Sequence, residues 1–120
     1  MHITIPLEPR TKKNHQQVFT TGAKPRVIAS KQYLQYEKDC APYMPKEREL
    51  IGYPVNVKCE YYMKTRRKVD LANLQQATLD VLVKYKVLMD DNCRIVASMD
   101  GSRVFYDKES PRTEIEIEVL

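Results

Sequence analysis

Three aspartates flank one predicted helix, and their type and spacing suit metal chemistry. Asp70 stands at the start of the helical segment, and Asp90 and Asp91 follow its end. Carboxylate oxygens bind hard cations such as Mg²⁺, which keep several waters and bridge to a substrate phosphate. Such a cation activates water and neutralises transition-state charge in phosphodiester hydrolysis. These residues therefore favour metal-assisted cleavage of a phosphate ester, if the fold brings them together.

Each of these aspartates also has a structural explanation. Asp70 fits the N-cap of the helix, and residues 90–92 have the composition of a turn. Asn73, one turn beyond Asp70, can orient a carboxylate or a water, or simply lie near the cap. Asp80 is a weaker ligand candidate, because it lies roughly 15 Å along the helix from Asp70. A salt bridge or a local helix contact is the expected role of Asp80.

Other kinds of site find little support in the sequence. The three cysteines, Cys40, Cys59 and Cys93, are 19 and 34 residues apart, which excludes a disulfide framework and a C-x-x-C knuckle. We expect them to be reduced and mostly packed. His2 and His15 are too few and too isolated for a zinc site. No G-x-x-x-x-G-K loop is present, so we expect no nucleotide cofactor.

Positive charge is concentrated in two parts of the chain, although the net charge is only +4. Residues 10–48 hold nine basic residues against three acidic ones, and residues 64–68 hold four basic residues and no acid. Residues 107–120 reverse the sign, with five acids against two bases. Such zoning favours a polyanionic partner such as nucleic acid, because counterion release strengthens each phosphate contact. The alternative is that these charges only confer solubility.

The eight tyrosines have two explanations of their own. A tyrosine can stack on an unpaired base or bind a phosphate. Most of them fall on apolar stripes, which favours core packing. Tyr62, on the polar face of its predicted strand, is the expected exception.

Length and composition predict one domain over residues 1–120. Hydrophobic residues make up 42% of the chain and charged residues 30%, a balance typical of globular proteins. No apolar run approaches the roughly 20 residues that span a bilayer, and the first residues do not resemble a signal peptide. We therefore expect a soluble cytoplasmic protein without a membrane partner.

The elements that would position these residues follow from hydrophobic periodicity. Apolar and polar residues alternate in a way that predicts strands. These strands are expected at residues 3–7, 55–63, 95–99, 104–106 and 113–119. Residues 104–106 would be the return of the preceding strand after an Asp100-Gly101 turn. Helical periodicity predicts one helix after Ser30, ending near Pro42, and a second after Asp70.

The predicted order is β, α, β, α, β, β, β, which fits an α+β fold. We expect one mixed β-sheet with two helices packed on one face. Residues 8–29 carry basic and polar side chains without a steady apolar period, so they are predicted as a long basic loop. The glutamate face of the last strand is expected to be a solvated surface.

Several segments together resemble one known family. These are Lys68 to Gln76 (KVDLANLQQ), Asp80 to Leu82, Leu88 to Asp91, the Lys12-Lys13-Asn14 turn and the final strand from Pro111 to Ile117. In order and spacing they resemble the RusA-type Holliday junction resolvases across nearly the whole chain.

The resemblance implies a small homodimeric endonuclease, often encoded by a phage or prophage. Such an enzyme depends on Mg²⁺, with Mn²⁺ as a substitute, and nicks two opposing strands of a four-way DNA junction symmetrically. Asp70 and Asp91 match metal-binding aspartates of the family, and Asn73 matches the Asn of its D-x-D-N motif. Basic and polar residues are assigned to DNA phosphates: Lys12, Lys13, Asn14, Lys24, Arg26, Lys64, Arg66, Arg67 and Lys68.

Two departures from the family pattern affect the candidate site. Ala72 stands where the family has a second aspartate, and Gln76 stands where it has a lysine. One hypothesis is that Asp90 supplies the third carboxylate, and that Lys68, Lys12 or Lys13 supplies the missing charge. The alternative is a catalytically impaired module that binds junction DNA without cutting it. A third hypothesis is a basic interaction domain without affinity for DNA.

Overall fold

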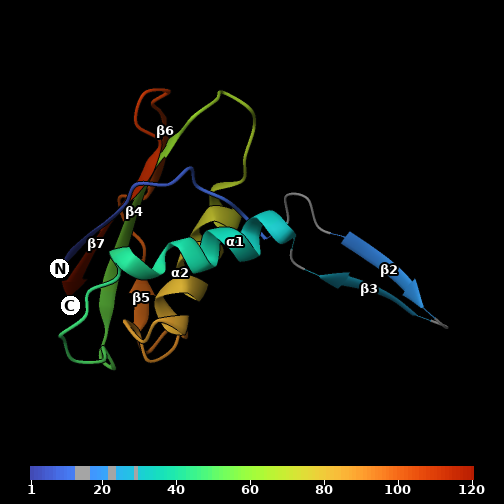
Figure 1. Cartoon of the computed structure of the whole chain (residues 1–120). Helices are drawn as coiled ribbons and strands as arrows, with labels where there is room; N and C mark the ends of the chain where they lie inside the picture. Colours follow the sequence, from blue (N-terminus) through green and yellow to red (C-terminus); the bar gives the residue numbers. More distant parts are fainter. Residues whose placement is uncertain (13–16, 22–23, 29) are drawn as a thin grey trace.

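The structure, a computed structural model, describes residues 1–12, 17–21, 24–28 and 30–120, and its centre is the strand β4 (Val55–Met63). On one side β4 pairs antiparallel with β7 (Arg112–Val119), which pairs antiparallel with β1 (His2–Ile5). On the other side β5 (Val96–Ser98) and β6 (Arg103–Tyr106) both run parallel to β4. The result is a five-stranded mixed sheet (Figure 1).

Alternation along β4 and β7 gives the sheet one apolar face. Every second residue of β4 from Val55 to Tyr61 is buried, and so are Thr113, Ile115 and Ile117 of β7. The intervening side chains lie on the opposite face, which we call the open face. Burying one face of each strand against helices is the main apolar contribution to folding.

Two helices cover the apolar face of the sheet (Figure 1). The first, α1 (Lys31–Asp39), begins at Ser30, whose Oγ accepts a hydrogen bond from the backbone N–H of Tyr33 at 3.1 Å. A short 3₁₀ helix, η1 (Ala41–Tyr43), follows it. The second, α2 (Leu71–Lys84), buries a stripe that includes Leu74, Val81 and Leu82. These helices confirm the predicted α+β fold. No described helix is long and apolar enough to cross a membrane.

The long loop predicted over residues 8–29 is wrong in part. β2 (Gln17–Thr21) and β3 (Lys24–Ile28) form an antiparallel hairpin within it. This hairpin is a separate two-stranded sheet that extends away from the helices and the main sheet (Figure 1). Such a hairpin is held together by backbone pairing between its own two strands, so it forms without a steady apolar period in the sequence.

The prediction that residues 104–106 return along the preceding strand is also wrong. β5 pairs with the beginning of β4, and β6 continues along the same edge near the end of β4. Asn56 Oδ1 redirects the chain by accepting hydrogen bonds from Ser98 Oγ at 2.5 Å and Asp100 N at 2.8 Å. Gly101 follows with φ of 88°. A Cβ there would lie 2.7 Å from Lys58 Cδ, so this position requires glycine.

The cysteines confirm the prediction of unpaired, mostly packed thiols. Cys40 and Cys59 are buried and Cys93 is exposed, and none is in a disulfide. Burial raises the pKa of the Cys40 thiol to about 12 and that of Cys59 to about 11. Both buried thiols are therefore protonated and unreactive at neutral pH.

Candidate active site

Asp70 occupies the N-cap position of α2, but its carboxylate does not cap the helix. Its backbone has extended dihedral angles, and its side chain accepts no hydrogen bond from the N–H groups of the first turn. Its Oδ2 instead accepts a hydrogen bond from Asn73 Nδ2 at 3.1 Å. The side chain is exposed. The predicted position is confirmed, and the carboxylate faces solvent with Asn73 orienting it.

Asp91 lies in the loop after α2 and is tied back to that helix. Its Oδ2 accepts a hydrogen bond from Gln76 Nε2 at 3.1 Å, and Gln76 Nε2 also lies 3.0 Å from Asp80 Oδ1. Gln76 is six residues beyond Asp70, or roughly 9 Å along the helix axis. The Gln76 amide thus fixes one oxygen of the Asp91 carboxylate against α2.

Asp90 plays a different part from its neighbour. Its Oδ1 accepts from the backbone N–H of Asp91 at 2.7 Å, and its Oδ2 accepts from Asn92 Nδ2 at 3.0 Å. The hydrogen bond from the backbone N–H of Asp91 and then the one from the Asn92 side chain lower the pKa of Asp90. Both oxygens therefore stabilise the turn, as the structural interpretation of residues 90–92 expected.

Asp80 connects this region to the N-terminal segment. Its Oδ2 lies 2.6 Å from Lys12 Nζ, which confirms the expected salt bridge. Lys12 Nζ also lies 5.5 Å from the centre of the Tyr33 ring. The chain of contacts Lys12–Asp80–Gln76–Asp91 was not anticipated from the sequence. Only the i, i+4 spacing of Gln76 and Asp80 was visible there.

Two carboxylates, those of Asp70 and Asp91, are the candidates to hold a metal. Among the described residues, no group of three or more His, Cys, Asp or Glu side chains can hold a metal ion. Ala72, the second residue of α2, supplies no ligand. Asp70 and Asp91 make no ion pair with any described residue. Mg²⁺ is commonly held by one or two carboxylates together with water and substrate phosphates.

The basic residues lie around the start of α2 in different settings. The link between β4 and α2 carries four of them, all exposed: Lys64, Arg66, Arg67 and Lys68. The Arg66 guanidinium packs 4.1 Å from the centre of the Tyr106 ring. Lys24 and Arg26 fall in β3, and Lys13 and Asn14 lie outside the described residues.

Tyr62 lies on the open face, as its polar-face position predicted. It is half-buried there, because it stacks on Phe105 with ring centres 4.9 Å apart and the Arg112 guanidinium covers it at 3.8 Å. Tyr33, Tyr36 and Tyr61 are buried, which confirms core packing for them.

Comparison with known proteins identifies the family. The model of the RusA endodeoxyribonucleases matches residues 6–118, from just after β1 through almost all of β7. No individual curated protein matches the chain. The matched range includes α2 and the three aspartates that flank it. The chain belongs to the RusA family of endodeoxyribonucleases, which are Holliday junction resolvases.

Proposed function

We propose that the chain resolves Holliday junctions by Mg²⁺-dependent cleavage, with Asp70 and Asp91 as the metal ligands. The observation that carries this proposal is the exposed Asp70 carboxylate, which sits at a helix N-cap without capping it. A cap would be the ordinary use of an aspartate there. A carboxylate held only by the Asn73 amide remains available to a cation.

The neighbouring side chains orient the two ligands. Asn73 donates to Asp70, and Gln76 donates to Asp91, so each carboxylate keeps an oxygen for the metal. Mg²⁺ at these oxygens supplies an activated water and neutralises charge on the phosphate, and Mn²⁺ suits the same ligands. Asp90 assists by holding the turn that presents Asp91. The Asp90→Asn variant tests the rival hypothesis that Asp90 is a third metal ligand. If it is, the Mg²⁺ dependence of cleavage must change in this variant.

DNA binding is assigned to basic and polar residues of the N-terminal segment and of the link between β4 and α2. The proposed phosphate contacts are Lys12, Lys13, Asn14, Lys24, Arg26, Lys64, Arg66, Arg67 and Lys68. Such contacts position DNA without reading its sequence, so junction shape would select the substrate. Lys12, near Gln76, and Lys68, next to Asp70, are candidates for the positive charge that the family lysine supplies.

A homodimer is part of this proposal. A four-way junction is two-fold symmetric, so two copies related by a two-fold axis would present one site to each of two opposing strands. Paired symmetric nicks follow from that arrangement. No nucleotide cofactor is needed, because hydrolysis of a phosphodiester requires only water and the metal.

A second candidate is a module that binds junctions without cutting them. Its support is the neutral pair Ala72 and Gln76, together with the absence of a three-carboxylate group among the described residues. In that case Asp70 and Asp91 would have too few partners to hold a metal at working concentrations.

The experiment that separates the two candidates compares a labelled four-way junction with a linear duplex of matched sequence. Each is incubated with the protein in Mg²⁺, in Mn²⁺ and in EDTA. Paired symmetric nicks in the junction alone, lost in EDTA, support the resolvase. Tight junction binding without nicks in either metal supports the binding module. Absence of salt-dependent junction binding contradicts both.

A further inference from the structure

A cavity of about 300 Å³ lies next to the start of α2. Its walls come from the segment after β1, the start of α1 and the link between β4 and α2. The lining residues are Glu8, Pro9, Arg10, Thr11, Ser30, Gln32, Tyr33, Met63, Thr65, Arg67, Lys68 and Val69. Lys68 and Val69 directly precede Asp70, so the cavity adjoins the proposed metal site.

The cavity combines apolar and cationic surfaces. Pro9, Met63, Val69 and the buried Tyr33 contribute apolar surface, and the Tyr33 hydroxyl is 3.5 Å from the Ala77 carbonyl. The cationic surface comes from Arg10, Arg67 and Lys68. Glu8 pairs with Arg10 at 3.3 Å and offsets that one charge. Arg67 and Lys68 leave the cavity with an excess of positive charge.

The start of α1 adds to the attraction for anions. Ser30, the N-cap residue, and Gln32 in the first turn both line the cavity. The partial positive charge of a helix N-terminus favours an anionic group, as the cations on the opposite wall do. The cavity therefore favours a ligand that carries a negative charge.

Two simple ligand classes fit these walls poorly. Inorganic phosphate would leave the apolar surface uncovered, and an apolar molecule would cover Arg67 and Lys68 without offering these cations an anionic partner. A nucleotide has both a base with apolar faces and an anionic phosphate. Pockets for small molecules start at about 300 Å³, which admits one nucleotide rather than a base pair.

We propose that the cavity receives one unpaired nucleotide of the junction strand, with its phosphate against Arg67 and Lys68. This inference rests on the proposed function and names the part of the DNA that the site engages. An unpaired nucleotide is easiest to extrude where strands exchange, because pairing and stacking are already weakened there. A nucleotide held beside Lys68 brings the next phosphate of the same strand toward Asp70.

Two arginines on different elements provide a matched test. Arg67 lines the cavity, whereas Arg103 of β6 lies against Phe105. Binding of 5′-deoxycytidine monophosphate is measured by calorimetry in EDTA, with inorganic phosphate as the comparison. Arg67→Ala should weaken nucleotide binding roughly tenfold, and Arg103→Ala should leave it unchanged. Equal losses in the two variants, or no preference for the nucleotide over phosphate, overturn the proposal.

A second measurement distinguishes a nucleotide of the DNA from a free one. A four-way junction carries 2-aminopurine at the exchange point, and its fluorescence is followed in EDTA while the protein binds. Unstacking should raise the fluorescence with the parental protein and with Arg103→Ala, and less with Arg67→Ala at saturating protein. Binding without any rise overturns the assignment to the junction strand, even if the free nucleotide binds.

These readouts are independent of cleavage. If the junction is bound and 2-aminopurine brightens but no nick appears in Mg²⁺, the proposed nuclease chemistry fails while the cavity assignment stands. If nicks appear without brightening, the cavity assignment fails while the chemistry stands. Thermal unfolding of each variant checks that the loss of Arg67 has not altered the fold.

Discussion

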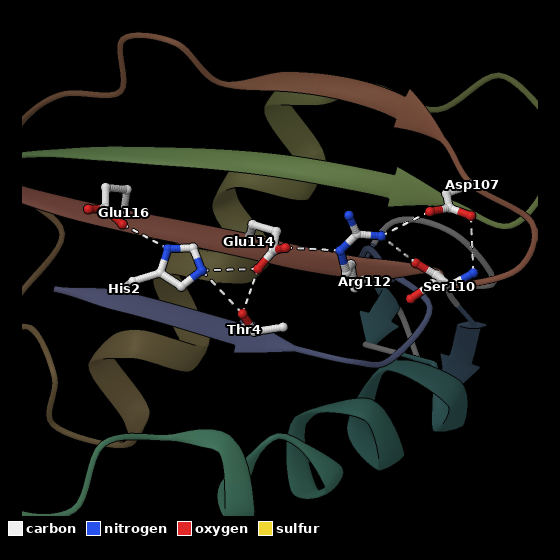
Figure 2. A network of polar contacts seen from close by, with 7 residues as sticks. All are labelled: His2, Thr4, Asp107, Ser110, Arg112, Glu114 and Glu116. Atoms are coloured by element: carbon white, nitrogen blue, oxygen red, sulfur yellow. Dashed lines mark hydrogen bonds and ion pairs between the residues drawn. The ribbon is translucent and has the colours of Figure 1, made fainter.

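Two groups of charged side chains, one on the open face and one at the two ends of α2, use their carboxylates differently. On the open face, Arg112 of β7 lies between Glu114 and Asp107, with Nε–O and Nη1–O distances of 2.9 Å and 3.0 Å (Figure 2). His2 lies between Glu114 and Glu116, at 3.1 Å and 2.8 Å. Asp107, Glu114 and Glu116 each contact a basic side chain.

Among the described residues, the Asp70 and Asp91 carboxylates at the ends of α2 contact side-chain amides and no basic group. Asp70 accepts from Asn73, and Asp91 accepts from Gln76. On the open face, hydrogen bonds from Thr4 and then Arg112 lower the pKa of Glu114, and the hydrogen bond from Arg112 lowers that of Asp107. Ion-paired carboxylates stabilise the fold, whereas carboxylates without a basic partner are open to a cation. The comparison separates structural carboxylates from candidate ligands.

The largest effect that tests this comparison is expected from Asp70→Asn or Asp91→Asn. Each change removes a proposed metal ligand but keeps the size and hydrogen bonding of the side chain. Cleavage of the junction should fall by roughly a hundredfold or more, beyond the loss typical of groups that only support a ligand. Junction affinity in EDTA should stay near the parental value. Parental cleavage rates in either variant would show that the site assignment is wrong.

Gln76→Ala should have the next largest effect, through Asp91. Without the amide, the Asp91 carboxylate loses its contact with α2, and cleavage should fall roughly 10- to 100-fold. Gln35→Ala is the matched control, because Gln35 makes the same kind of i, i+4 contact with Asp39 in α1, at 2.8 Å. The comparison is made from cleavage rates at saturating junction. Equal rates in the two variants would contradict a positioning role for Gln76.

Ala72→Asp should lower the Mg²⁺ requirement of cleavage, because it adds a third carboxylate without a basic partner near Asp70. Ala72 is exposed in the first turn of α2, so the substitution is sterically tolerated. Metal affinity depends on the number of charged ligands, and the Mg²⁺ concentration for half-maximal cleavage should fall roughly tenfold. Ala72→Asn controls for side-chain size. An unchanged Mg²⁺ requirement in the aspartate variant would place residue 72 away from the metal.

Arg112→Ala tests the group of charged side chains on the open face. It removes ion pairs to Glu114 and Asp107 and the contact with Tyr62. Because the pairs are partly exposed, the free energy of unfolding should fall by only about 1 kcal/mol, measured in urea. Cleavage by the folded variant should match the parental rate. A large loss of cleavage without a loss of stability would mean that the open face takes part in catalysis.

The smallest expected effect is the pH dependence of His2. Its hydrogen bonds to Glu116 and then Glu114 raise the pKa of the imidazole, so its contribution to stability is complete below the unfolded pKa of about 6.5. That contribution is lost as the pH rises through the folded-state pKa. The stability difference between the parental protein and His2→Gln should shrink by a few tenths of a kcal/mol between about pH 5 and pH 9. A difference that grows with pH would contradict a charged His2.

Local sequence patterns were enough to predict the core of the fold. The alternation along β4 and β7 and the helical stripe of α2 are set by which side chains must leave water. The β2–β3 hairpin was missed because it forms a two-stranded sheet of its own, apart from the main sheet, and shows no steady apolar period. β6 was misplaced because the period of a strand does not show which neighbour it pairs with.

For the candidate site, too, local features could be predicted from the sequence and contacts between elements could not. The sequence by itself determined that Asp70 begins a helix and that Asp91 follows it, because caps and turns depend on residues nearby in the chain. The folded structure was needed to see that the Asp70 carboxylate does not cap α2. It was also needed to see the hydrogen bond from Gln76 to Asp91 and the salt bridge between Lys12 and Asp80. The physical reason is that short-range contacts depend on side-chain directions across separate elements, which no local spacing encodes.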